Sequence, residues 1–175
     1  MIIILAGLPG TGKSTLARAL ADAAGGVVLD KDPIRAVLFA PGYVEYSKEQ
    51  DDFCQVLMVE TAAYLLARHP GLRIFIDGRT FSQQYQIDRV IQAAENLKAE
   101  WRVIECICAE GTARERLEKS AATHPARNRN FELYRTLRAR FEPIVAPKLV
   151  VHTDSPLSVC VAEALAYLAE IPGAR

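Results

Sequence analysis

The strongest constraint in this sequence is an apolar run near its start that leads directly into a glycine-rich segment. Residues 2–6 read IIILA, residues 7–14 read GLPGTGKS, and an alanine- and leucine-rich stretch follows from Thr15 to Ala24. An unbroken apolar run bounded by a turn signal predicts a strand buried on both faces of a parallel sheet. The stretch after the glycines predicts a helix. The chain therefore begins as strand, loop and helix, which favours an α/β fold.

The glycine-rich segment matches the phosphate-binding pattern G-x-x-x-x-G-K-[ST]. Its glycines let successive N–H groups point at an anion, the ammonium of Lys13 can reach terminal phosphates, and the hydroxyl of Ser14 can bind Mg²⁺. An ordinary glycine-rich turn is the alternative, but the flanking strand and helix favour phosphate binding, because a helix N-terminus carries partial positive charge. We expect ATP to be held by Gly7, Leu8, Pro9, Gly10, Thr11, Gly12, Lys13, Ser14 and Thr15.

Composition limits the classes of protein to which this chain can belong. Its 21 basic residues balance 21 acidic ones, so no overall charge attracts it to nucleic acid or a membrane surface. The N-terminal apolar run is too short and lacks the basic flank of a signal peptide, and no stretch approaches the roughly 20 apolar residues of a membrane span. The four cysteines show no C-x-x-C spacing. We expect one domain over residues 1–175 that is cytoplasmic, with no membrane partner.

Strand and helix patterns alternate along the rest of the chain. Strands are expected at 27–29, 72–76, 101–108 and 148–152, and helices at 33–39, 47–69, 83–97, 112–120, 131–141 and 155–169. This alternation predicts parallel strands joined by right-handed crossovers, with ligands beyond the carboxyl ends of the strands. Cys106 and Cys108 alternate along one strand and are expected to face the core together.

Several helix starts carry capping signals. Asp32 before Pro33 fits an N-cap followed by proline at the first helical position. Capping-box patterns place Ser47 and Gln50 at the start of the long helix and Thr112 and Glu115 at the start of a later one, and Asn130 can cap the helix after it. On the long helix, the apolar positions expected to face the core are Phe53, Val56, Leu57, Val59, Ala63 and Leu66.

The segment after the second strand contains candidates for chemistry on a second substrate. Phosphoryl transfer to a hydroxyl needs the acceptor oxygen positioned and its proton accepted next to the γ-phosphate. Asp32, close to a strand end beside the phosphate loop, is suited to that role, and Arg35 could hold an anionic group of the acceptor. Alternatively, Asp32 only caps its helix and Arg35 is a solvated surface residue.

These motifs together resemble the small P-loop kinases, in particular adenylylsulfate (APS) kinases and polynucleotide 5′-hydroxyl kinases. The resemblance rests on the phosphate loop, on residues 29–35 (LDKDPIR) and on the strand ending at Asp77. It implies a three-layer P-loop NTPase fold with a sheet of about five parallel strands in the order 2-3-1-4-5, helices on both faces and a helical lid. It also implies that Asp32 is the general base, that Arg35 contacts the acceptor and that Thr153 lies near the adenine.

Two departures from APS kinases weaken APS as the acceptor. Lys31 stands where those enzymes usually carry glycine, and Asp77 is followed by GRTFS in place of their Phe-Ile-Ser-Pro stretch. Asp77 could hold Mg²⁺ or bind the acceptor together with Arg79, or it could only cap a turn. Together with Ser14, the strand-end acids Asp30 and Asp77 are the expected metal ligands.

The region 112–140 has the largest local excess of positive charge, with eight basic residues against three acidic ones. A lid closing over the transferred phosphoryl group would use such charge. The candidates are Arg116 and Arg127 for catalysis and Arg129 for nucleotide binding. The alternative is that these arginines are solvated or in weak i,i+4 ion pairs, as the spacing of Arg114 from Glu118 suggests.

The sequence thus favours an ATP-dependent phosphotransferase acting on a hydroxyl of a small, anionic metabolite or nucleotide such as adenylylsulfate. A polynucleotide 5′-hydroxyl kinase is the first alternative, supported by Asp32 and Arg35 but not by the balanced charge. A nucleotide-binding switch without an acceptor is the second. The chain has no Asn-Lys-x-Asp motif for guanine, which argues against a GTPase switch.

Overall fold

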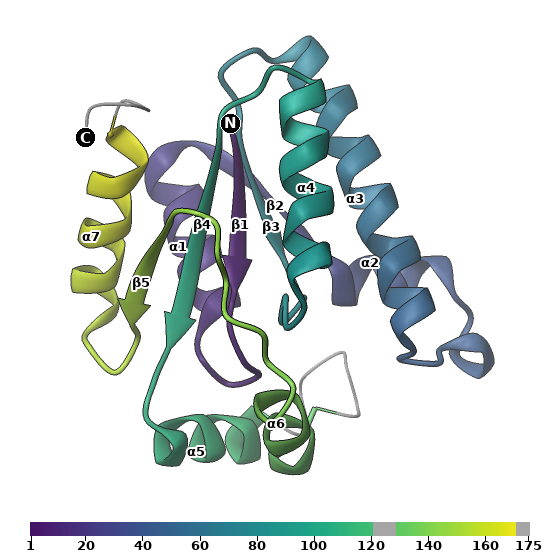
Figure 1. Ribbon diagram of the computed structural model, residues 1–175, viewed down its shortest axis with the longest axis vertical. Helices are drawn as coiled ribbons and strands as arrows, with labels where there is room; N and C mark the ends of the chain where they lie inside the picture. The colour runs from purple at the N-terminus through teal and green to yellow at the C-terminus, as the bar shows by residue number, and fades with distance from the viewer. Residues whose placement is uncertain (121–128, 171–175) are drawn as a thin grey trace.

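The computed structural model of the protein describes residues 1–120 and 129–170 (Figure 1). Its five strands form one sheet in the order β2-β3-β1-β4-β5, and every neighbouring pair is parallel. The strands are β1 (Ile2–Ala6), β2 (Gly26–Asp30), β3 (Arg73–Asp77), β4 (Trp101–Ile107) and β5 (Lys148–His152). The expected P-loop NTPase sheet order is confirmed.

Helices cover both faces of this sheet, as Figure 1 shows. They are α1 (Lys13–Ala24), α2 (Lys31–Leu38), α3 (Lys48–Arg68), α4 (Gln84–Asn96), α5 (Glu110–Ser120), α6 (Phe131–Arg138) and α7 (Leu157–Ala169), with a short 3-10 helix at Pro41–Tyr43. Because side chains alternate across a strand, Ile2 and Ile4 of β1 pack with α3 and α4, whereas Ile3 and Leu5 pack with α1 and α7. The result is a three-layer structure with a core on each face.

The start of α2 differs from the prediction. Asp30, and not Asp32, is the N-cap, and its carboxylate accepts a hydrogen bond from the backbone N–H of Asp32 at 3.0 Å. The helix begins directly at the end of β2, so Pro33 occupies its third position. Proline is tolerated there because the first four N–H groups of a helix have no partner within it.

The prediction for α3 is right in its bounds and wrong in part for its buried face. Ser47 caps the helix by accepting from Gln50 N–H at 3.1 Å. The fully buried apolar residues are Cys54, Met58 and Ala62, whereas Phe53 and Val56 are half-exposed. Apolar residues occur on every side of this helix, so their spacing does not identify the face that contacts the sheet.

The segment after β4 also departs from expectation. Cys106 is buried in the core between the sheet and α1 and α7, but β4 ends at Ile107, and Cys108 belongs to a separate cluster with Leu8 and Phe131. Helix α5 begins at Glu110, before the start expected at Thr112. Just ahead of it, the carboxylate of Asp154 accepts a hydrogen bond from the N–H of Ala109 at 2.8 Å.

Asn130 caps α6 as predicted, through the N–H of Leu133. Helices α5 and α6 lie beyond the carboxyl ends of the strands, where the lid was expected (Figure 1). No helix in residues 1–120 or 129–170 is both long and apolar enough to cross a membrane. That residues 1–175 form one domain stays a prediction.

Candidate functional site

The phosphate loop between β1 and α1 has the backbone that its glycines predict. Gly12 is the N-cap of α1 with φ of 81°, a left-handed conformation that favours glycine. A side chain on Gly7 would place its Cβ 2.3 Å from the carbonyl oxygen of Cys106. The loop can therefore lie against the end of β4 only if Gly7 lacks a side chain.

The side chain of Lys13 is folded back onto this loop. Its Nζ donates to the carbonyl oxygens of Gly7 at 2.8 Å and Leu8 at 3.0 Å. Burial lowers the pKa of the ammonium, while the nearby carboxylate of Asp77 acts in the opposite direction. A desolvated cation held at a helix N-terminus is an arrangement that suits phosphate oxygens.

The end of β5 is connected to the same loop through Thr153. Its hydroxyl donates to the carbonyl of Thr11 at 2.9 Å. Arg116 of α5 donates to the hydroxyl and the carbonyl of Thr153, at 3.0 and 2.7 Å. Arg116 thus lies against the phosphate loop but outside the cavity described below, and its proposed catalytic role stays a prediction, as does nucleotide binding by Thr153. Arg127 lies outside the described residues.

Two acidic residues face each other at the ends of neighbouring strands, Asp30 on β2 and Asp77 on β3. Asp77 is fully buried, and within the described part of the chain neither of its carboxylate oxygens has a hydrogen-bond partner. Burial and the charge of Asp77 raise the pKa of Asp30 to about 6. Among the described residues no three His, Cys, Asp or Glu side chains come together as a metal site.

A buried carboxylate without a hydrogen-bond partner favours a bound cation, and the phosphate loop presents the hydroxyl of Ser14 to the cavity at the same edge of the sheet. Mg²⁺ typically takes only one or two protein oxygens, with water and substrate phosphates completing its shell. Ser14 and Asp77 fit that donor set. Asp30 fits it less well, because its carboxylate already caps α2.

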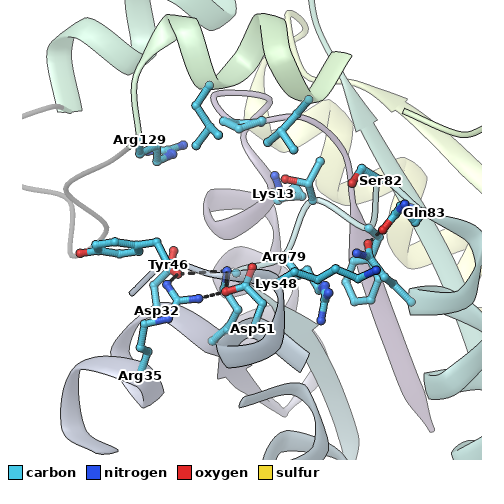
Figure 2. A pocket seen from close by; sticks show the side chains of 18 of the residues that line it. Lys13, Asp32, Arg35, Tyr46, Lys48, Asp51, Arg79, Ser82, Gln83 and Arg129 are labelled. Carbon is cyan, nitrogen blue, oxygen red and sulfur yellow. Dashed lines mark hydrogen bonds and ion pairs between the residues drawn. The ribbon is translucent and has the colours of Figure 1, made fainter. Parts of the chain in front are cut away.

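These elements surround a cavity of about 360 Å³ beyond the carboxyl edge of the sheet (Figure 2). Lys13 and Arg129 lie on one side of it, and Asp32, Arg35 and Asp51 lie on the opposite side. We call the first side the donor half and the second the acceptor half. The remaining charged residues that line the cavity are Lys31, Lys48, Arg79 and Arg140.

Arg129, just before α6, brings a positive charge into the donor half. Its guanidinium donates to the hydroxyl of Ser120 at 3.2 Å. Burial lowers the pKa of Arg129, and the carboxylates of Asp32, Asp77 and Asp30 oppose that shift. The guanidinium therefore lies within electrostatic reach of both strand-end acids and of Asp32. Its role in nucleotide binding stays a prediction.

In the acceptor half, Asp32 and Arg35 are brought together as predicted, but with an additional partner. Arg35 is buried, donates to Asp32 at 3.3 Å and contacts the carboxylate of Asp51. Lys31 is also buried, lies 2.9 Å from Asp51 and 3.5 Å from Asp32, and has its pKa lowered by desolvation to about 8. The guanidinium of Arg35 lies over the ring of Tyr46, 5.1 Å from its centre.

Arg79 is likewise held by α3. Its two terminal nitrogens donate to Asp52 at 2.5 Å and to Gln55 at 2.6 Å. Asp51, Asp52 and Gln55 were not identified from the sequence. Adjacent acids near a helix start are common because they interact favourably with the helix dipole, so nothing in the sequence marks them as partners of buried cations.

The raised pKa of Asp30 predicts a pH effect on stability. An unfolded-state value of 3.8 and a folded-state value of about 6 mean that the folded protein binds the extra proton between these pH values. The free energy of unfolding should therefore fall as pH rises from about 4 to 6, by on the order of 3 kcal/mol from this group. Urea unfolding of Asp30→Asn, which keeps a capping oxygen, should lack this contribution. Equal pH profiles for native and variant protein would contradict it.

Comparison with known proteins agrees with this geometry. Residues 2–144 match the family model described as AAA domain. A candidate kinase from Chloroflexus aurantiacus is similar in structure, with 23% identity over 94% of this chain and 96% of that one and a TM-score of 0.74. A gluconokinase from Sinorhizobium meliloti has 18% identity over 95% of this chain and 90% of that one, with a TM-score of 0.70. A Mycobacterium tuberculosis APS kinase in complex with AMPPNP and APS has 15% identity over 97% of each chain, with a TM-score of 0.72. No curated protein matches the sequence. The chain therefore belongs to the AAA domain family and has the fold of the small P-loop kinases.

Proposed function

We propose that this protein is an ATP-dependent phosphotransferase that moves the γ-phosphoryl group to a hydroxyl of a small metabolite or nucleotide. The observation that carries the proposal is that one cavity is lined by Lys13 and Ser14 of the phosphate loop and by Asp32 opposite them. A nucleotide-binding switch needs the first two residues but has no use for a carboxylate positioned across the cavity. A kinase needs all three.

The chemistry follows from these positions. Lys13 would exchange its two carbonyl partners for the oxygens of the terminal phosphates. Asp32 would orient the acceptor hydroxyl and take its proton as the oxygen attacks phosphorus. Arg129 would stabilise the charge that spreads over the phosphoryl oxygens, and closure of α5 and α6 would exclude water. ADP leaves with the electrons of the broken bond to the γ-phosphate.

Mg²⁺ would be held by Ser14 and Asp77. When bound, it supplies positive charge to the phosphate oxygens of ATP. The burial of Asp77 without a hydrogen-bond partner in the described residues supports this assignment over a turn-capping role.

A polynucleotide 5′-hydroxyl kinase is the second candidate. It is supported by two exposed basic residues that line the cavity, Lys48 and Arg140, which could contact phosphates beyond a 5′ end. The activity would then fall steeply with added salt, because each phosphate contact releases counterions.

The test is ADP release measured across acceptors: APS, nucleosides, sugars and 5′-hydroxyl oligonucleotides. We expect at least one class to raise ADP release above the rate with ATP and Mg²⁺ alone, and phosphate to appear on its hydroxyl by mass spectrometry. Transfer to oligonucleotides with strong salt dependence would select the second candidate. ATP binding with no stimulation by any class would instead favour a switch or binding module.

A further inference from the structure

The cations of the acceptor half are already paired with carboxylates. Lys31 and Arg35 are both buried and share two acidic partners, Asp32 and Asp51. Asp51 comes from the first turn of α3 and contacts both cations, which belong to α2. An acceptor group that used either cation as its anchor would have to compete with Asp51.

Arg79, the third buried cation, is held more completely. One terminal nitrogen donates to Asp52 and the other to Gln55, whose own amide nitrogen donates to the carbonyl of Gln86 at 2.7 Å. Asp52 also accepts from Tyr85 and Arg89 of α4. The position of Arg79 is therefore fixed by α3 and α4 together.

The buried cations of the acceptor half and their acidic partners together form an electrically neutral set. The cations are Lys31, Arg35 and Arg79, and the carboxylates are Asp32, Asp51 and Asp52. The excess positive charge of the cavity lies outside these pairs, on Lys13 and Arg129 of the donor half and on the exposed residues Lys48 and Arg140. Of these, Lys48 lies on the same side as Arg79 and Asp51 but is exposed (Figure 2). A charged acceptor group entering among the buried pairs would either break one of them or remain without a counterion, and both are costly.

We propose that Asp51 and Asp52 are specificity-determining residues that keep this half neutral, so that the acceptor is an uncharged hydroxyl compound where it lies beside Asp32. This inference rests on the proposed phosphotransferase function and narrows its substrate class. It replaces the anionic acceptor expected from Arg35 and Arg79 in the sequence. The chemical class is a sugar, polyol or nucleoside moiety, recognised by hydrogen bonds to the paired charges.

The first test uses sulfate as a probe of anion binding, with the donor half filled by Mg²⁺ and the non-hydrolysable analogue AMPPNP. Thermal unfolding is followed while sulfate is added at constant ionic strength, since a ligand that binds only the folded protein raises its stability. We expect no saturable sulfate effect on the native protein. Asp51→Asn and Asp52→Asn, each with a released cation, should show saturable sulfate binding, at concentrations about tenfold or more below the highest one that leaves the native protein unaffected. Glu49→Gln, an exposed acid on the same turn of α3, is the matched control.

The outcomes separate this inference from the proposed function. Saturable sulfate binding by the native protein that Arg79→Gln removes would overturn the neutral acceptor half. Failure of both variants to gain sulfate binding would overturn the role of the two aspartates. If the two aspartate variants do not fold, sulfate titrations of the native protein and of Arg79→Gln decide the question. Absence of any stabilisation by AMPPNP would count against the phosphotransferase itself.

The second test uses matched acceptors that differ only in charge, such as a hexose against its 6-phosphate and a nucleoside against its 3′-monophosphate. The uncharged member should have the higher kcat/KM by about tenfold or more, and Asp51→Asn should reduce or reverse that preference through KM. A native preference for the charged member would overturn the inference while leaving the phosphotransferase function intact.

Discussion

Replacing Asp32 with asparagine is expected to lower acceptor-dependent ADP release by about 10²- to 10⁴-fold, the range that general-base removal typically costs. The amide keeps the size of the side chain and can still accept a hydrogen bond from Arg35, which lies 3.3 Å away in the native protein. What it loses is the ability to take a proton from the acceptor hydroxyl. The effect should therefore appear in kcat, with ATP affinity changed by no more than about twofold.

The Asp32→Asn variant can also lose stability, and this loss has to be measured apart from its loss of activity. Asp32 also lies beside Lys31, so its replacement leaves a buried cluster with one carboxylate fewer. Urea unfolding of the variant shows how much of the change is structural. Asp22→Asn, at an exposed position on α1, is the control that alters charge without touching the cavity. Native rates of acceptor-dependent ADP release from a folded Asp32→Asn protein would contradict the assignment.

The fold could be predicted largely from the sequence because its main signals are local. The apolar run at 2–6, the glycines after it and the alternation of strand and helix patterns each depend on neighbouring residues, and together they require parallel strands. The strand-end rule then placed Lys13, Asp32 and Asp77 at one edge, where the structure has them.

Two of the errors of local reasoning, the start of α5 and the missed acidic partners of Lys31 and Arg79, share one physical cause, which is that the deciding partner is distant in sequence. Asp154 accepts from the N–H of Ala109, 45 residues away and just before α5, and the helix starts at Glu110, so the cap expected at Thr112 was wrong. Asp51 and Asp52 pair with Lys31 and Arg79, 20 and 27 residues away. No spacing pattern contains such pairs, so the cluster of paired charges in the acceptor half could be found only once the strands and helices were placed.

Replacing Lys13 with methionine is expected to lower ATP turnover strongly without lowering the free energy of unfolding to a similar extent. Lys13 is buried, and desolvation lowers the pKa of its ammonium, so folding carries the cost of removing that charge from water. Methionine fills a similar volume without that charge. What the variant loses is the two hydrogen bonds to the carbonyls of Gly7 and Leu8 and the attraction between the ammonium and the buried carboxylate of Asp77.

The interactions that the variant loses and the desolvation cost that it removes have opposite effects on stability. Hydrogen bonds from a charged donor contribute about 1.5–3 kcal/mol each, and desolvating an ion costs several kcal/mol. The free energy of unfolding without nucleotide should therefore stay within about 1 kcal/mol of native or rise, as is common where a site residue is retained at the expense of stability. ATP turnover should instead fall by about 10²- to 10³-fold, since a preorganised donor to the developing phosphate charge is gone. Lys119→Met on exposed α5 should change neither quantity. If Lys13→Met unfolds the protein yet the surviving fraction turns over ATP at the native rate, Lys13 is a structural residue of the loop and the phosphates are held by backbone alone.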